Sequence, residues 1–129
     1  MLQDYGTKGF PPLPYDFDAF INLLHTHGHN FFRLWTWEQQ RWACWSPSDD
    51  RWYSPSAYAR IEGRGVALDG LPKYDLTRYN PPYFQRLHDR VAEAGRHGIY
   101  VAVMLVQRGS VEFKRDRYEL LWKNHLTLP

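Results

Sequence analysis

The sequence predicts an α/β fold with parallel strands, because two stretches of the chain repeat the same order of helix, glycine and strand. The first stretch covers residues 16–35 and the second covers residues 80–106. A further observation is the almost wholly apolar run 99–106, which is typical of a strand buried on both faces of a parallel sheet. Two such strands leave open edges, so their neighbours are missing from the chain or come from another copy.

The first unit begins with an amphipathic helix. Its apolar face is formed by residues at positions i, i+3, i+4 and i+7, namely Phe17, Phe20, Ile21 and Leu24. Asp16 is the expected N-cap, and Gly28 is expected to end the helix in a left-handed conformation. Residues 30–35 follow as a predicted strand.

The second unit repeats this design. Asn80 is the expected N-cap, and Pro81 stands at the first helical position, where its missing N–H costs nothing. Gly98 ends the helix as Gly28 ends the first. The inner helix face is predicted to hold Phe84, Leu87, Val91 and Ala94. A short helix is also expected over residues 117–124.

A segment of unusual length, residues 36–79, separates the two units and is interpreted as a loop. It is much longer than an ordinary connection between a strand and a helix, and loops of this size are usually functional or disordered. Its many tryptophans and tyrosines argue against disorder. We therefore expect a functional loop.

The loop leaves the carboxyl end of the first strand, where barrels built from such units bind ligands. An aromatic face stacks on a sugar ring, and a charged side chain fixes the sugar's hydroxyls. The residues predicted to contact a sugar are Arg33, Trp35, Trp37, Glu38 and Gln107. The alternative for each tryptophan is packing in the core of the loop, since large aromatic side chains are commonly buried.

Composition excludes several other functions. The formal net charge is +2 and the basic residues form no tract, so no nucleic-acid partner is expected. No apolar run approaches the length of a membrane span, and the first residues show no signal-peptide pattern.

Cys44 is the only cysteine and is interpreted as a partly buried free thiol. His25, His27 and His29 have the wrong spacing for a helical zinc site, so neither a metal nor a cofactor is expected.

Glycoside hydrolysis needs two carboxyl groups on either side of the scissile bond. Of the glutamates, only Glu38 and Glu112 follow a predicted strand closely. A Glu38/Glu112 pair rests on position alone, so no catalytic residue is assigned.

Several motifs, taken in order, resemble a family of bacterial cellulase-like barrels. They lie at residues 28–35, 67–76, 80–86 and 98–105, and the resemblance covers nearly the whole chain. The family comprises glycoside hydrolases related to the apiosidase-like catalytic domain, often joined to a domain described as collagen-binding. Val106, Arg108 and Gly109 depart from the family's pattern, which has Phe, Gly and Trp there.

The resemblance implies one partial (β/α)8 barrel over residues 1–129, truncated at both ends and containing the second and third strands. A whole barrel needs about 250 residues. It also implies that the acid/base and nucleophile glutamates follow later strands, and that Arg33 supports the nucleophile's side of the site. The family is mostly exported, whereas this chain shows no export signal, so its location stays open.

The function expected from these features is that of a glycoside hydrolase fragment acting on O-glycosidic bonds of a plant or bacterial polysaccharide, without its catalytic pair. Its partner would be carbohydrate. The alternative is a non-catalytic carbohydrate-binding or self-assembling module, which associates through exposed sheet edges. A third hypothesis is an incomplete gene model whose product is unstable alone.

Overall fold

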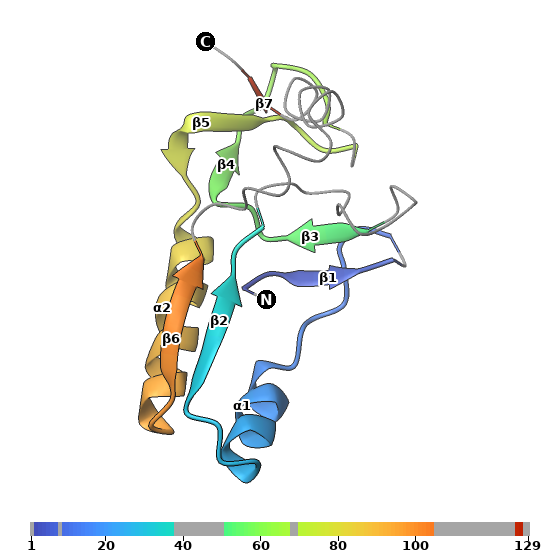
Figure 1. The fold of residues 1–129 in the computed structure, drawn as a ribbon. Coiled ribbons are helices and arrows are strands. Elements are labelled where there is room, and N and C mark those ends of the chain that lie inside the picture. The colour runs from blue at the N-terminus through green and yellow to red at the C-terminus, as the bar shows by residue number, and fades with distance from the viewer. Residues whose placement is uncertain (1, 8, 38–50, 68–69, 105–125, 128–129) are drawn as a thin grey trace, which may run out of the picture.

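The computed structural model describes residues 2–7, 9–37, 51–67, 70–104 and 126–127 (Figure 1). The chain order of the elements is β1 (Asp4–Gly6), α1 (Phe17–Thr26), β2 (Phe31–Trp35), β3 (Trp52–Ser54), β4 (Tyr58–Arg60), β5 (Tyr74–Tyr79), α2 (Pro81–Arg96), β6 (Tyr100–Met104) and β7 (Leu126–Thr127). This order confirms the helix, the glycine and the strand of both predicted units, but part of the predicted burial is wrong. Tyr100, in the strand expected to be buried on both faces, is 74% exposed, and Phe84 and Val91, expected on the inner face of α2, are exposed as well. The predicted helix over 117–124, like Cys44 and Glu112, lies outside the described residues.

The ends of α1 follow the predicted capping chemistry. The Asp16 carboxylate accepts a hydrogen bond of 2.8 Å from the backbone N–H of Ala19, which satisfies a free donor in the first turn. Gly28 has a φ of +69° and closes the other end. The backbone N–H of His29 then returns to the carbonyl of Leu24 at 2.9 Å, as in a Schellman motif.

The two ends of α2 differ in how well the sequence predicts them. Pro81 begins the helix as expected, and Gly98, with a φ of +70°, closes it with the same return hydrogen bond, from Ile99 N–H to the Ala94 carbonyl. Asn80 stands at the N-cap position, but its side chain makes no cap bond. The side-chain amide of Asn80 donates instead to the Ser56 carbonyl at 2.8 Å. This bond links the start of α2 to the segment between β3 and β4.

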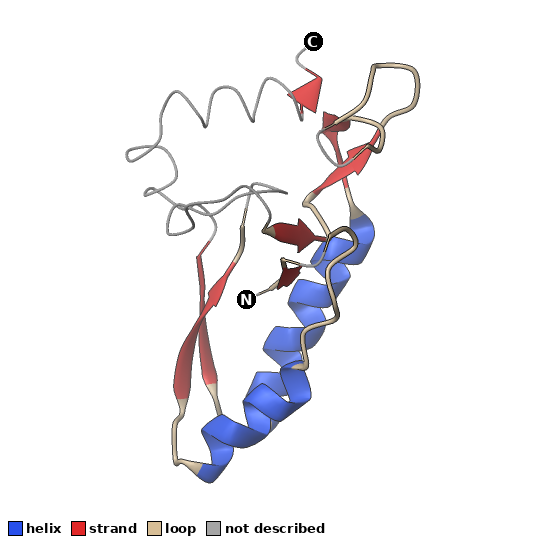
Figure 2. Ribbon diagram, turned by 90° about the vertical axis from the view of Figure 1, so that its right-hand side faces the viewer, coloured by secondary structure: helices blue, strands red, loops and turns tan. Residues whose placement is uncertain are grey.

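β2 and β6 form a parallel pair whose register runs from Phe31 opposite Tyr100 to Trp35 opposite Met104. Side chains of a strand alternate between its two faces. Phe32 and Leu34 belong to the buried core, on the side of the pair where both helices lie (Figure 2). That core contains Leu2, Phe17, Ile21, Phe32, Leu34, Tyr83, Ala94 and Ile99.

The predicted partial (β/α)8 barrel is wrong. A barrel needs its strands side by side in one continuous sheet, but the described strands form three small separate sheets. The segment 36–79, expected to be a loop, contains β3, β4 and β5. β3 pairs antiparallel with β1, and β5 lies between β4 and β7, so none of them extends the β2–β6 pair. In a barrel, β7 would have been the strand next to β6.

Candidate functional site

The first candidate site is the open face of the β2–β6 pair, which we define as the face opposite the helices. β2 contributes Arg33, which is exposed, and Trp35, which is half-buried. They are two positions apart along the strand, so both side chains lie on the same face, away from Phe32 and Leu34. Across the pair, their register partners are Ala102 and Met104. The structure thus brings together two of the five residues predicted to contact a sugar.

Trp37 has a different environment. Its side chain is 2% exposed and its ring centroid lies 5.4 Å from that of Tyr53. Its backbone is held by Gln3, whose side-chain oxygen accepts from the Trp37 N–H at 2.7 Å and whose side-chain N–H donates to the Trp37 carbonyl. This packing is the alternative that the sequence left open for the tryptophans. Glu38 and Gln107 lie outside the described residues.

Glu93 and the three histidines with the wrong spacing for a zinc site lie apart from the open face. Glu93 lies on α2, where Arg96 and His97 hydrogen-bond to its carboxylate. The rings of His27 and His29 lie 6.5 Å apart, while His25 meets His97 edge-on at 5.8 Å. Among the described residues, no group of three His, Cys, Asp or Glu side chains is placed to hold a metal. No helix in the described part of the chain is long and apolar enough to cross a membrane.

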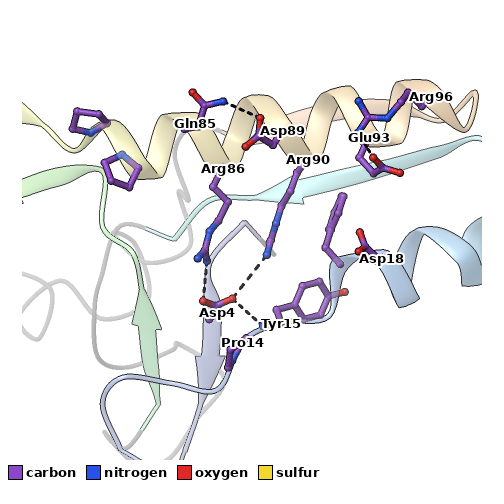
Figure 3. A pocket seen from close by; sticks show the side chains of 13 residues that line it. Asp4, Pro14, Tyr15, Asp18, Gln85, Arg86, Asp89, Arg90, Glu93 and Arg96 are labelled. Carbon is purple, nitrogen blue, oxygen red and sulfur yellow. Dashed lines mark hydrogen bonds and ion pairs between the residues drawn. The ribbon is translucent and has the colours of Figure 1, made fainter.

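A second candidate site is a concave groove of about 880 Å³ between α2 and the segment before and at the start of α1 (Figure 3). We call it the α2 groove. Its lining residues are Asp4, Pro14, Tyr15, Phe17, Asp18, Pro81, Pro82, Gln85, Arg86, Asp89, Arg90, Glu93 and Arg96. In Figure 3, Arg86 and Arg90 point from α2 toward Asp4 on β1.

Asp4 organises the floor of the α2 groove. Its carboxylate accepts from Arg86 at 2.9 Å and from the backbone N–H of Tyr15 at 2.9 Å, and Arg90 lies 3.9 Å away. Arg90 is 8% exposed and also donates to the Leu2 carbonyl. Its guanidinium lies over the rings of Tyr15, at 5.5 Å, and Phe17, at 4.9 Å. Asp4 and Arg90 are therefore held in place by hydrogen bonds, an ion pair and ring contacts.

Burial and neighbouring charges shift several pKa values around the groove. Burial, with Arg86 as a second cause, lowers the pKa of Arg90, and burial raises the pKa of Tyr15. The hydrogen bond from Gln85 lowers the pKa of Asp89, with a smaller effect from His88. The pKa of Glu93 is lowered mainly by its hydrogen bond with Arg96. At neutral pH the two carboxylates accept hydrogen bonds, while the Tyr15 hydroxyl keeps its proton.

The α2 groove was not predicted from the sequence. Arg86 and Arg90 are four residues apart on a predicted helix, so their common face could have been found. Asp4 is 82 residues from Arg86, and no local pattern links the two. The same holds for Gln3 and Trp37, which are 34 residues apart.

Comparison with family models, with curated proteins and with solved structures finds no match for this chain. The resemblance to cellulase-like glycoside hydrolases therefore stays a prediction.

Proposed function

We propose that the chain binds carbohydrate on the open face of the β2–β6 pair. The observation that carries this proposal is that Arg33 and Trp35 share that face near the carboxyl end of β2. An indole ring offers a flat apolar surface to the C–H groups of a sugar ring. A guanidinium beside it donates to hydroxyl oxygens in a fixed geometry.

In this proposal the open face supplies substrate contacts, within a glycoside hydrolase that acts on O-glycosidic bonds of a plant or bacterial polysaccharide. The described strands β2 and β6 carry no Asp or Glu. Hydrolysis requires a pair of carboxyl groups, so the open face is proposed to bind and not to cleave.

The test is a binding titration of the chain against a panel of soluble oligosaccharides. For the best ligand, Trp35→Ala is expected to weaken binding about tenfold, which corresponds to loss of about 1.4 kcal/mol of stacking and burial. Trp35→Phe keeps an aromatic face and is expected to lose less. Arg33→Ala is expected to weaken binding about fivefold through lost hydrogen bonds.

The matched control is Arg78→Ala, which removes an exposed arginine from β5 and is expected to leave binding unchanged. The proposal is contradicted if no glycan binds, or if binding survives both Trp35→Ala and Arg33→Ala. Turnover of a glycan that is lost on replacing Glu38 or Glu112 would contradict a different expectation, namely that the chain is without its catalytic pair.

A second candidate function, self-association, is favoured by the outer edge of β6. Among the described strands, β6 pairs only with β2, and its sequence contains no charge and no proline to block another strand. Beside it, α2 leaves an apolar hollow of about 490 Å³. The hollow is lined by Phe84, Leu87, His88, Val91, Ala92 and Val103. An edge that pairs with no other described strand, next to an apolar surface, suits a second copy of the chain.

Sedimentation velocity over a range of protein concentrations tests this second candidate. The wild-type chain is expected to form a dimer, and Val91→Lys is expected to shift it to monomer, because it places a charge in the hollow. Leu23→Lys changes an exposed apolar residue of α1 and serves as control. A monomer at every concentration, or a dimer insensitive to Val91→Lys, contradicts self-association through this edge.

A further inference from the structure

We propose that the α2 groove is a separate binding site for an uncharged, polyhydroxylated ligand such as a short neutral oligosaccharide. The groove lies on the helix side of the β2–β6 pair (Figures 2 and 3). Arg33 and Trp35 lie on the opposite face, because they alternate along β2 with the buried Phe32 and Leu34. This inference does not rest on the function proposed for the open face.

The size and rigidity of the groove suit a small ligand. The groove is a depression open to solvent with a volume of about 880 Å³, which is room enough for a small ligand. Arg90 and Asp4 are held by hydrogen bonds and ring contacts before any ligand arrives. Because Asp4 and Arg90 are already ordered, binding costs little further side-chain entropy at the floor of the groove.

The charge balance of the lining favours a neutral ligand. Four carboxylates, those of Asp4, Asp18, Asp89 and Glu93, face three guanidinium groups, those of Arg86, Arg90 and Arg96. The net charge is close to zero, so neither a strong anion nor a strong cation is selected. A hydroxyl group both donates and accepts hydrogen bonds. It can therefore bond to the carboxylates as well as to the guanidinium groups.

The polar groups available to such a ligand lie on both sides of the groove. Asp18, at the start of α1, and Asp89, on α2, are exposed acceptors. The side chain of Arg86 is 33% exposed although it is paired with Asp4. Tyr15 is half-buried and adds an aromatic edge and a protonated hydroxyl. Because Arg90 lies over the Tyr15 ring, this tyrosine offers its edge and its hydroxyl rather than a stacking face.

The groove is less suited to two other kinds of ligand, a phosphate group and a metal ion. A phosphate at the start of α2 would need free backbone N–H groups, but the first two helical residues are Pro81 and Pro82, which have none. A metal ion would need several carboxylate or imidazole ligands at one point. Among the described residues, no group of three such side chains is placed to hold one, and both oxygens of Glu93 already contact Arg96 and His97.

The experiment is an amide NMR titration of the whole chain with cellotetraose as the neutral probe. Galacturonic acid tetramer and spermidine serve as the anionic and cationic probes. Cellotetraose is expected to shift amides at residues 15–18 and 85–93. Asp18→Ala and Asp89→Ala are each expected to weaken this binding roughly fivefold, since each removes a hydrogen-bond acceptor.

Glu62→Ala, which removes an exposed carboxylate from the turn after β4, is the matched control and is expected to have no effect. Trp35→Ala is also expected to leave the groove amides responsive, so failure of the open-face proposal is distinguishable from failure of this one. The inference is overturned if cellotetraose leaves the groove amides unshifted, if either charged probe binds there more tightly, or if Asp18→Ala and Asp89→Ala bind like the control.

Discussion

Replacing Leu34 with alanine is expected to lower the free energy of unfolding by about 3–5 kcal/mol, near the upper end for removing a buried leucine side chain. Leu34 is fully buried in the core that both helices cover. Its loss removes apolar burial and leaves a cavity that rigid neighbours fill only in part. The expected loss is large compared with the stability of a small domain.

Urea denaturation measures this effect, with Leu23→Ala as the matched control. Leu23 is 56% exposed on α1, so its truncation is expected to cost less than about 1 kcal/mol. If Leu34→Ala and Leu23→Ala cost the same, Leu34 does not face the core. Because Arg33 and Trp35 alternate with it, their place on the open face would then be wrong as well.

Gln3→Ala is expected to lower the free energy of unfolding by about 2–4 kcal/mol. The Gln3 side chain is 1% exposed and binds both the N–H and the carbonyl of Trp37. Each of these buried backbone groups costs about 1–3 kcal/mol when it is left without a partner. Alanine cannot reach either group, and water has little access to the site.

The matched control for Gln3→Ala is Gln85→Ala, because Gln85 is an exposed glutamine whose side-chain N–H donates to the Asp89 carboxylate on the helix surface. Its expected cost is within about 0.5 kcal/mol. Near-ultraviolet circular dichroism is expected to change only for Gln3→Ala, through the rings of Trp37 and Tyr53. A loss no larger than that of the control contradicts the assigned role of Gln3.

Much of the local structure was predictable from the sequence because it depends on neighbouring residues. The cap at Asp16, the start of α2 at Pro81 and the left-handed turns at Gly28 and Gly98 all follow from backbone chemistry within a few positions. The place of Arg33 on the face opposite Leu34 follows from strand alternation. These features required no knowledge of distant contacts.

The pairing of the strands was not predictable in this way. The two edges of β5, residues 74–79, can form hydrogen bonds with any of several strands. That its partners are β4 and β7 follows from the packing of the whole chain. The expected barrel failed at this step. The α2 groove depends on the same kind of information, because Asp4 meets Arg86 across 82 positions.

The sequence by itself determined the two helices, the parallel strands that follow them, and the side of β2 that carries Arg33 and Trp35. Only the tertiary structure decided that the strands form separate small sheets, that Trp37 is buried against Tyr53, and that Asp4 joins two arginines beneath a groove. Helix caps and alternation act over a few residues. Strand partners and buried ion pairs depend on which distant segments gain most by excluding water together.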